Sequence, residues 1–186
     1  MSFMKNFRFL VSLFLISVLF IPAYSKQNST LNGLFNQLKN TENSQNADFL
    51  EKKIWAIWNE HPKNNNLTEK LKLGTDLMRE GSYGYALKVF NNVIKTDPGW
   101  SEAWNKRATL LFFMNNFKRS LQDIRVVLSL EPRHFGALSG QAQIYIELGE
   151  YEKAIKSLEK ATQIYPVIKS NKIIPSLEKI IKEQSI

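Results

Sequence analysis

Three prolines, Pro98, Pro132 and Pro166, stand 34 residues apart in this chain. At the same offset, residues of like size or character align at eight further positions, nine in all. The clearest sets are small residues and aromatic residues: Gly74, Ala108 and Ala142, and Tyr83, Phe117 and Tyr151. An internal period of 20–50 residues is typical of chains that stack one supersecondary unit on the next. The sequence therefore predicts a solenoid of repeated units.

Each unit has the pattern of two helices joined by a turn. In the third unit, apolar residues recur every three to four positions up to Leu148, as on an amphipathic helix. Gly149 follows, and the corresponding positions hold Gly81 and Asn115, residue types that tolerate a left-handed backbone at a helix end. A second apolar stripe then runs to Pro166, which ends the unit because proline has no backbone donor.

This pattern resembles the tetratricopeptide repeat family, whose units are two antiparallel helices with a terminal proline. Written as such units, the repeats are residues 67–100, 101–134 and 135–168, and Trp104 stands where the family often has tryptophan. Lys70 departs from the family pattern, because an early large apolar residue is expected there. The resemblance implies an all-α fold: a right-handed solenoid of three antiparallel helix pairs with helical N- and C-terminal caps.

The segments that flank the repeats also have helical patterns. Residues 26–66 contain two apolar stripes around a polar loop, so they form either a separate helical hairpin or a degenerate fourth repeat over residues 31–64. Residues 169–186 carry one more amphipathic stripe, and Pro175 suits the first turn of a helix there. Because a solenoid needs caps over the apolar faces of its end units, we expect a C-terminal capping helix.

Residues 1–25 have the pattern of a secretory signal peptide. A short basic start precedes an apolar run over residues 9–21, and the small residues Ala23 and Ser25 suit a signal peptidase. We therefore expect cleavage after Ser25 and export, most simply to a periplasm. The alternative is an uncleaved anchor in the inner membrane, although the run is shorter than the ~20 residues that a spanning helix needs.

The composition leaves little room for a catalytic or metal site. The chain has no cysteine, which excludes disulfides, thiolate metal sites and cysteine nucleophiles, and its only histidines are His61 and His134. We find no catalytic motif and predict no catalytic residue, no cofactor and no metal. The net charge of +8 is spread along the chain without a block of like charges, so we do not expect a nucleic-acid partner.

The resemblance also implies a binding surface, because the first helices of tetratricopeptide units line a concave groove. The resemblance implies these candidate partner-binding residues there: Thr75, Arg79, Asn105, Lys106, Thr109, Phe113, Ser139 and Gln143. Polar groups around Phe113 suit an extended peptide or a helix. Family members that grip a C-terminal carboxylate need lysine and asparagine at positions where this chain has Leu71 and Thr75, so a two-carboxylate clamp is not expected.

The sequence thus predicts a non-catalytic protein–protein interaction module, an exported adaptor or assembly factor that binds a partner protein or peptide in its groove. In this it resembles small exported tetratricopeptide proteins of Gram-negative bacteria. Two alternatives stay open at this point. One is a membrane-tethered envelope scaffold, if residues 1–25 remain attached. The other is an envelope-polymer hydrolase or transferase, which would require paired carboxylates that face one cleft.

Overall fold

The computed structural model describes residues 22–185, and every regular element in this range is a helix. In chain order these are α1 (Pro22–Lys39), α2 (Ser44–Asn59), α3 (Asn65–Arg79), α4 (Tyr83–Thr96), α5 (Ser101–Phe113), α6 (Phe117–Leu130), α7 (Phe135–Glu147), α8 (Tyr151–Ile164), the 3-10 helix η1 (Lys169–Ile173) and α9 (Ile174–Gln184). Most of the predicted signal peptide, residues 1–21, lies outside the described residues.

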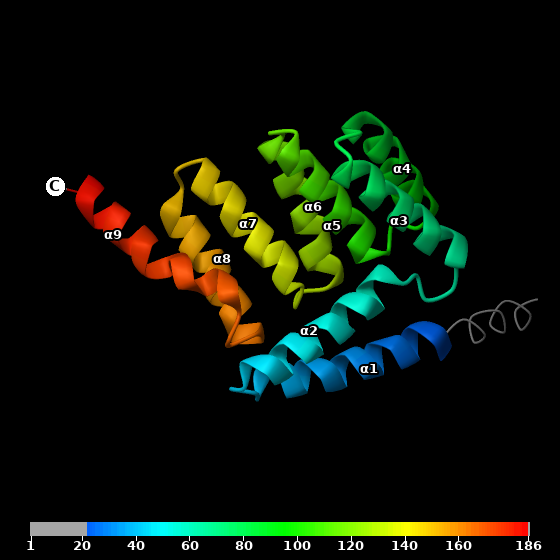
Figure 1. The fold of residues 1–186 in the computed structure, drawn as a ribbon, viewed down its shortest axis with the longest axis horizontal. Coiled ribbons are helices and arrows are strands. Elements are labelled where there is room, and N and C mark those ends of the chain that lie inside the picture. Colours follow the sequence, from blue (N-terminus) through cyan, green and yellow to red (C-terminus); the bar gives the residue numbers. More distant parts are fainter. Residues whose placement is uncertain (1–21, 186) are drawn as a thin grey trace, which may run out of the picture.

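Helices α3 to α8 form three antiparallel pairs that stack side by side (Figure 1). The pairs are α3–α4, α5–α6 and α7–α8, and successive pairs meet where α4 packs on α5 and α6 on α7. At the turns within the pairs, Gly81, Asn115 and Gly149 have φ values of 78°, 55° and 71°. This is the left-handed backbone that ends a helix and reverses the chain. The arrangement confirms the predicted all-α solenoid.

Apolar residues at the repeat positions fill the space within each pair. Phe90 and Val93 of α4 are fully buried against α3, and Leu158 of α8 is buried against α7. Close approach of α3 and α4 depends on Gly74, because a Cβ at this position would lie 2.5 Å from Cε1 of Phe90. The aligned small residues of the sequence thus lie where two helices cross.

The variant Gly74→Ala tests this close approach. The added methyl group has to displace the Phe90 ring, so we expect the free energy of unfolding to fall by about 1–3 kcal/mol. Gly84 in α4 is the matched control, because a Cβ there meets nothing within 4 Å. Gly84→Ala should be neutral or stabilising by up to about 1 kcal/mol through helix propensity. Urea denaturation measures both variants, and equal stabilities would refute the predicted clash.

Helices α1 and α2 form a hairpin that packs on the solenoid outside the repeat register. Helix α2 packs on α5 rather than on α3, and α1 packs on α8, so the hairpin runs across the ends of the repeat helices (Figure 1). One buried cluster joins it to α7 and α8: Leu31, Leu34, Phe35, Leu38, Ala47, Leu50, Ile54, Trp58, Phe135, Leu138, Ala161, Tyr165 and Ile168. The two helices therefore do not continue the stacking of the three pairs.

The C-terminal segment covers the last repeat. Leu177 of α9 is buried with Ala142, Ala154 and Leu158, which belong to α7 and α8. Pro175 lies in the first turn of α9, where a missing backbone N–H costs no helical hydrogen bond. Between residues 22 and 185, no helix is both long and apolar enough to cross a membrane.

Candidate functional site

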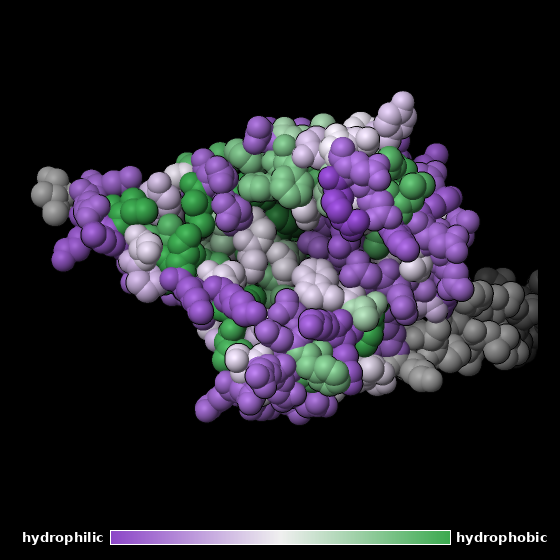
Figure 2. Space-filling view, viewed as in Figure 1, coloured by the Kyte–Doolittle hydropathy of each residue, from purple (hydrophilic) through white to green (hydrophobic). Residues whose placement is uncertain are grey.

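Helices α3, α5 and α7, the first helices of the three pairs, form one layer. We call the surface of this layer that lies on the side of α2 the inner face. Helix α5 contacts α3, α7 and α2. Trp55 of α2 packs on the start of α7, where a Cβ at Gly136 would lie 2.5 Å from its ring, and Lys106 of α5 lies 5.7 Å from the ring centroid. The hairpin therefore covers the inner face near the beginnings of α5 and α7. Above it the surface is hollowed between α7 and α5 (Figure 2).

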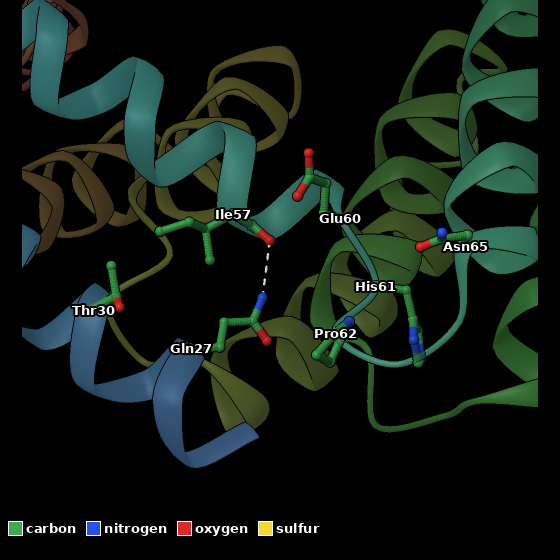
Figure 3. Close-up of a pocket in the computed structure, with 7 residues that line it drawn as sticks. All are labelled: Gln27, Thr30, Ile57, Glu60, His61, Pro62 and Asn65. Carbon is green, nitrogen blue, oxygen red and sulfur yellow. Dashed lines mark hydrogen bonds between the residues drawn. The ribbon is translucent and has the colours of Figure 1, made fainter. Parts of the chain in front are cut away.

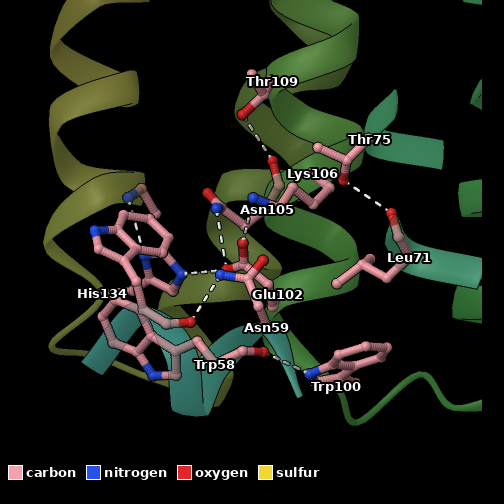
Figure 4. Close-up of polar contacts among 12 residues, drawn as sticks. Trp58, Asn59, Leu71, Thr75, Trp100, Glu102, Asn105, Lys106, Thr109 and His134 are labelled. Atoms are coloured by element: carbon pink, nitrogen blue, oxygen red, sulfur yellow. Dashed lines mark hydrogen bonds and ion pairs between the residues drawn. The ribbon is translucent and has the colours of Figure 1, made fainter. Parts of the chain in front are cut away.

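A buried polar network lies beneath the hairpin (Figure 4). Glu102 of α5 is fully buried, and its Oε2 accepts hydrogen bonds from Nε2 of His134 at 3.0 Å and Nδ2 of Asn105 at 3.2 Å. Nζ of Lys106 lies 3.0 Å from the other carboxylate oxygen. Trp58 of α2 stacks on the His134 ring, with centroids 4.0 Å apart and planes 8° apart. The network thus joins α5 to α7 and supports the hairpin.

The protonation state of this network follows from its geometry. Nδ1 of His134 accepts the backbone N–H of Ala137 at 3.1 Å, so the proton of the neutral ring is on Nε2 and points to Glu102. Burial raises the pKa of Glu102, but the hydrogen bond from His134 and the charge of Lys106 outweigh it and hold this pKa below its ordinary value. Glu102 is therefore a charged, paired carboxylate, which suits a structural role rather than proton donation at neutral pH.

His61 makes a similar pair at the entry to the first repeat. Its Nε2 lies 2.7 Å from Oδ2 of Asp97, and its Nδ1 accepts the backbone N–H of Lys63 at 3.2 Å. It borders a pocket of about 450 Å³ beside the hairpin, where the Gln27 amide donates to the carbonyl of Ile57 (Figure 3). Across the part of the chain that the structure describes, no group of three histidine or acidic side chains is placed to hold a metal ion.

Four of the eight predicted partner-binding residues are buried or half-buried and have their polar groups engaged within the chain. Asn105 is only 8% exposed and bonds to Glu102, to which Lys106 is also paired. The hydroxyl groups of Thr75 and Thr109 donate to carbonyl oxygens one turn earlier in their own helices. The two residues on α5 nearest the hairpin, Asn105 and Lys106, thus belong to the buried network.

Of the other four, Arg79, Phe113 and Gln143 are exposed, and Ser139 is half-buried. Phe113 is 51% exposed and stacks on Tyr83, with ring centroids 6.4 Å apart. Arg79 and Gln143 are exposed, and each reaches a carboxylate one turn away on its own helix. The hydroxyl groups of Ser139 and Ser170 lie 3.0 Å apart and connect α7 to η1. The open inner face thus extends from the end of α3 across α5 to α7.

Residues beyond the third repeat also border the inner face, and the alignment of units did not include them. Lys172 and Ile173 of η1 and Ser176 of α9 line a cleft beside Ile146 of α7. The alignment ended at residue 168, so it assigned the following lysines only to a cap. The signal that could have found them is the amphipathic stripe of residues 173–181, which implies a buried side against α8 and an opposite side with lysines.

Comparisons with known proteins identify relatives of this chain. The family model of the tetratricopeptide repeat matches residues 135–166. A TPR repeat-containing protein of Rhizobium etli is 35% identical over 144 residues, which span 77% of this chain and 70% of the relative. DnaJ homolog subfamily C member 3 of Bos taurus is 28% identical over 116 residues, and the match spans 60% of this chain but only 22% of that protein.

Solved structures share the fold at low sequence identity. The first TPR of Spaghetti (RPAP3), bound to the HSP90 peptide SRMEEVD, has a TM-score of 0.59 and 17% identity, over 62% of this chain and 93% of that one. The Yersinia enterocolitica type III secretion chaperone SycD, in complex with a peptide of the translocator YopD, has a TM-score of 0.57 and 15% identity, over 68% and 100%. MamA protein has a TM-score of 0.55 and 19% identity, over 86% of each chain.

Proposed function

Because the chain belongs to the tetratricopeptide repeat family, we propose that it is a non-catalytic adaptor or assembly factor that binds a segment of a partner protein. Stacked helical repeats present an extended concave surface, which suits recognition of a peptide or a helix. Two of the structures with this fold hold peptides. The buried carboxylate of Glu102 is paired and turned away from solvent, which gives no support to the hydrolase alternative.

The observation that carries the proposal is the exposed aromatic surface at the open part of the inner face. Phe113 of α5 is half exposed although it is large and apolar, and Met114 next to it is 40% exposed. The hairpin fills the opposite end of this face, at the beginnings of α5 and α7. A partner segment therefore has room between the ends of α3 and α7, with Phe113 at its centre. Phenylalanine and methionine are enriched in protein–protein interfaces relative to the rest of the surface.

A photo-crosslinking residue at position 113 tests this placement. Benzoylphenylalanine in place of Phe113 should form a crosslink to a partner protein in the native host. The same residue in place of Tyr85, which is 67% exposed on α4 in the outer layer, should not. Phe113→Ala should lower partner affinity about tenfold with little change in melting temperature, because the side chain lies at the surface. Equal crosslinking at both positions, or none at position 113, would contradict the proposal.

We also propose that the protein acts after export, with residues 1–25 removed. Gln27, whose amide bonds to the carbonyl of Ile57, lies beyond the expected cleavage position, so cleavage retains this contact. The mass of the protein purified from its native host tests the proposal. A first residue Lys26 would support it, and a retained leader would favour the membrane-tethered scaffold instead.

A further inference from the structure

The cleft beside α7 is a second candidate surface, at the C-terminal end of the inner face. It has a volume of about 470 Å³ and lies between α7 and the segment η1–α9. Its apolar lining residues come from three helices: Ala142, Ile146, Leu158 and Ile173. Figure 2 shows hydrophobic atoms gathered between α7 and α9, with hydrophilic atoms beside them. The cleft is therefore an apolar hollow with a polar edge.

Two contacts hold the walls of this cleft in place, one beneath α9 and one between the walls themselves. Leu177 is 2% exposed and anchors α9 on α8, and the Ser139–Ser170 contact of 3.0 Å fixes η1 against α7. By contrast, Ile173 at the edge of the cleft is 41% exposed. A hollow that exists before a partner arrives saves the ordering cost that a flexible site has to overcome on binding.

The charged residues that line the cleft are both lysines. Lys169 and Lys172 line it, and none of its described lining residues is acidic. Lys169 pairs with Asp48 of α2 at 3.1 Å while its side chain stays 73% exposed. Lys172 is exposed and forms no ion pair with any described residue of the chain. An acidic partner would neutralise this edge, whereas a basic one would be repelled.

We propose that the cleft binds an acidic amphipathic helix of the partner protein, which rests on the protein-binding function proposed above. Ser139, Ala142, Gln143 and Ile146 lie at intervals of three and four on α7, so they form one helical wall, and the opposite wall is η1–α9. Such a groove accepts the apolar stripe of a helix, with acidic residues on its flanks beside the lysines. A flat membrane surface fits less well, because the apolar floor is recessed between two helices.

A designed peptide tests the proposal on the purified protein. The probe is a synthetic amphipathic helix with leucine at i, i+3, i+4 and i+7 and glutamate on both flanks. Fluorescence anisotropy should detect its binding, and the same peptide with lysine in place of glutamate should bind at least about tenfold more weakly. Lys172→Glu should lower the affinity for the acidic peptide about tenfold, and Ile173→Ser should lower the affinity for both peptides. Lys156→Glu, the same charge change on the exposed side of α8, is the matched control and should have little effect.

Several outcomes would overturn the proposal. These are equal binding of the acidic and basic peptides, no binding of either, or equal effects of Lys172→Glu and Lys156→Glu. Stronger binding to phosphatidylglycerol vesicles than to the acidic peptide would assign the surface to a membrane, and self-association lost in Ile173→Ser would assign it to a second copy. If the residue at position 113 crosslinks to a partner whose affinity Lys172→Glu leaves unchanged, the proposed function stands and this cleft does not contribute.

Discussion

Replacement of Trp58 by alanine should lower the free energy of unfolding by about 3–5 kcal/mol. The side chain is 4% exposed and stacks on His134, and its ring centroid lies 5.1 Å from that of Phe135 and 5.8 Å from that of Phe35. Its removal leaves a cavity between the hairpin and the solenoid. Because the buried network of Glu102 lies directly beneath, water that enters the cavity would also weaken the pairing there. Urea denaturation followed by circular dichroism measures the loss.

Two further variants separate packing at Trp58 from general effects on α2. Trp58→Phe keeps an aromatic ring on His134 and removes an indole N–H that has no hydrogen-bond partner among the described residues, so it should cost much less than alanine. Phe49→Ala removes an aromatic residue of the same helix that is 54% exposed, and it should change stability by less than about 0.5 kcal/mol. If Trp58→Ala were as mild as Phe49→Ala, the hairpin could not depend on this contact.

Glu102→Gln should lower the free energy of unfolding by about 3 kcal/mol, which is at the lower end of the loss for a broken buried ion pair. Glutamine can still accept the hydrogen bond from His134, but it leaves Lys106, whose side chain is 19% exposed, without its counter-charge. The partial exposure of Lys106 lets its ammonium group reach water, which limits the loss. In the double variant Glu102→Gln, Lys106→Met no unpaired charge remains, so part of the stability should return. If the losses of Glu102→Gln and Lys106→Met were simply additive, there would be no coupling between the two side chains.

The pH dependence of stability supplies an independent check of Glu102. Its pKa is lower in the folded chain than the ordinary value of 4.5, so the unfolded chain binds the proton more readily. The stabilising contribution is therefore complete above pH 4.5 and is lost as the pH falls through the folded pKa. Across that acidic range the stability of Glu102→Gln should depend less on pH than that of the unaltered chain. Parallel curves for the two proteins would contradict the lowered pKa.

The repeat architecture could be predicted from the sequence because its signals are local. The 34-residue spacing fixes each helix pair, and residues such as Gly81 and Asn115 mark turns wherever the chain is placed in space. The position of the hairpin could not be predicted in this way. Its apolar stripes, such as the one that includes Ile54 and Trp58, show that one side of each helix is buried. They do not say which surface buries it, because a stripe that packs on α3 and one that packs on α5 have the same period.

For the candidate site too, the sequence predicts local features but not the effect of the hairpin. The resemblance to tetratricopeptide units places Asn105 and Phe113 on the inner face, and the binding role of these residues stays a prediction. Only Phe113 is open to a partner, because the hairpin covers the face around Asn105. The contact between Glu102 and His134 joins residues 32 positions apart, and no motif marks them as a pair. Alignment with a repeat family assigns residues to a face of a helix, whereas exposure depends on elements outside the repeat.

The hairpin contacts segments that lie far from it in the sequence. Arg133 donates to Asn32 across 101 residues, and Lys169 reaches Asp48 across 121 residues. In an open solenoid each unit touches only its neighbours, so stability is a sum of local terms and the end units can unfold separately. Here the contacts of α1 and α2 with α5, α7 and α8 bypass this nearest-neighbour chain. Loss of the hairpin would expose the second and the third repeat at once, so the molecule should unfold in a single cooperative transition rather than unit by unit.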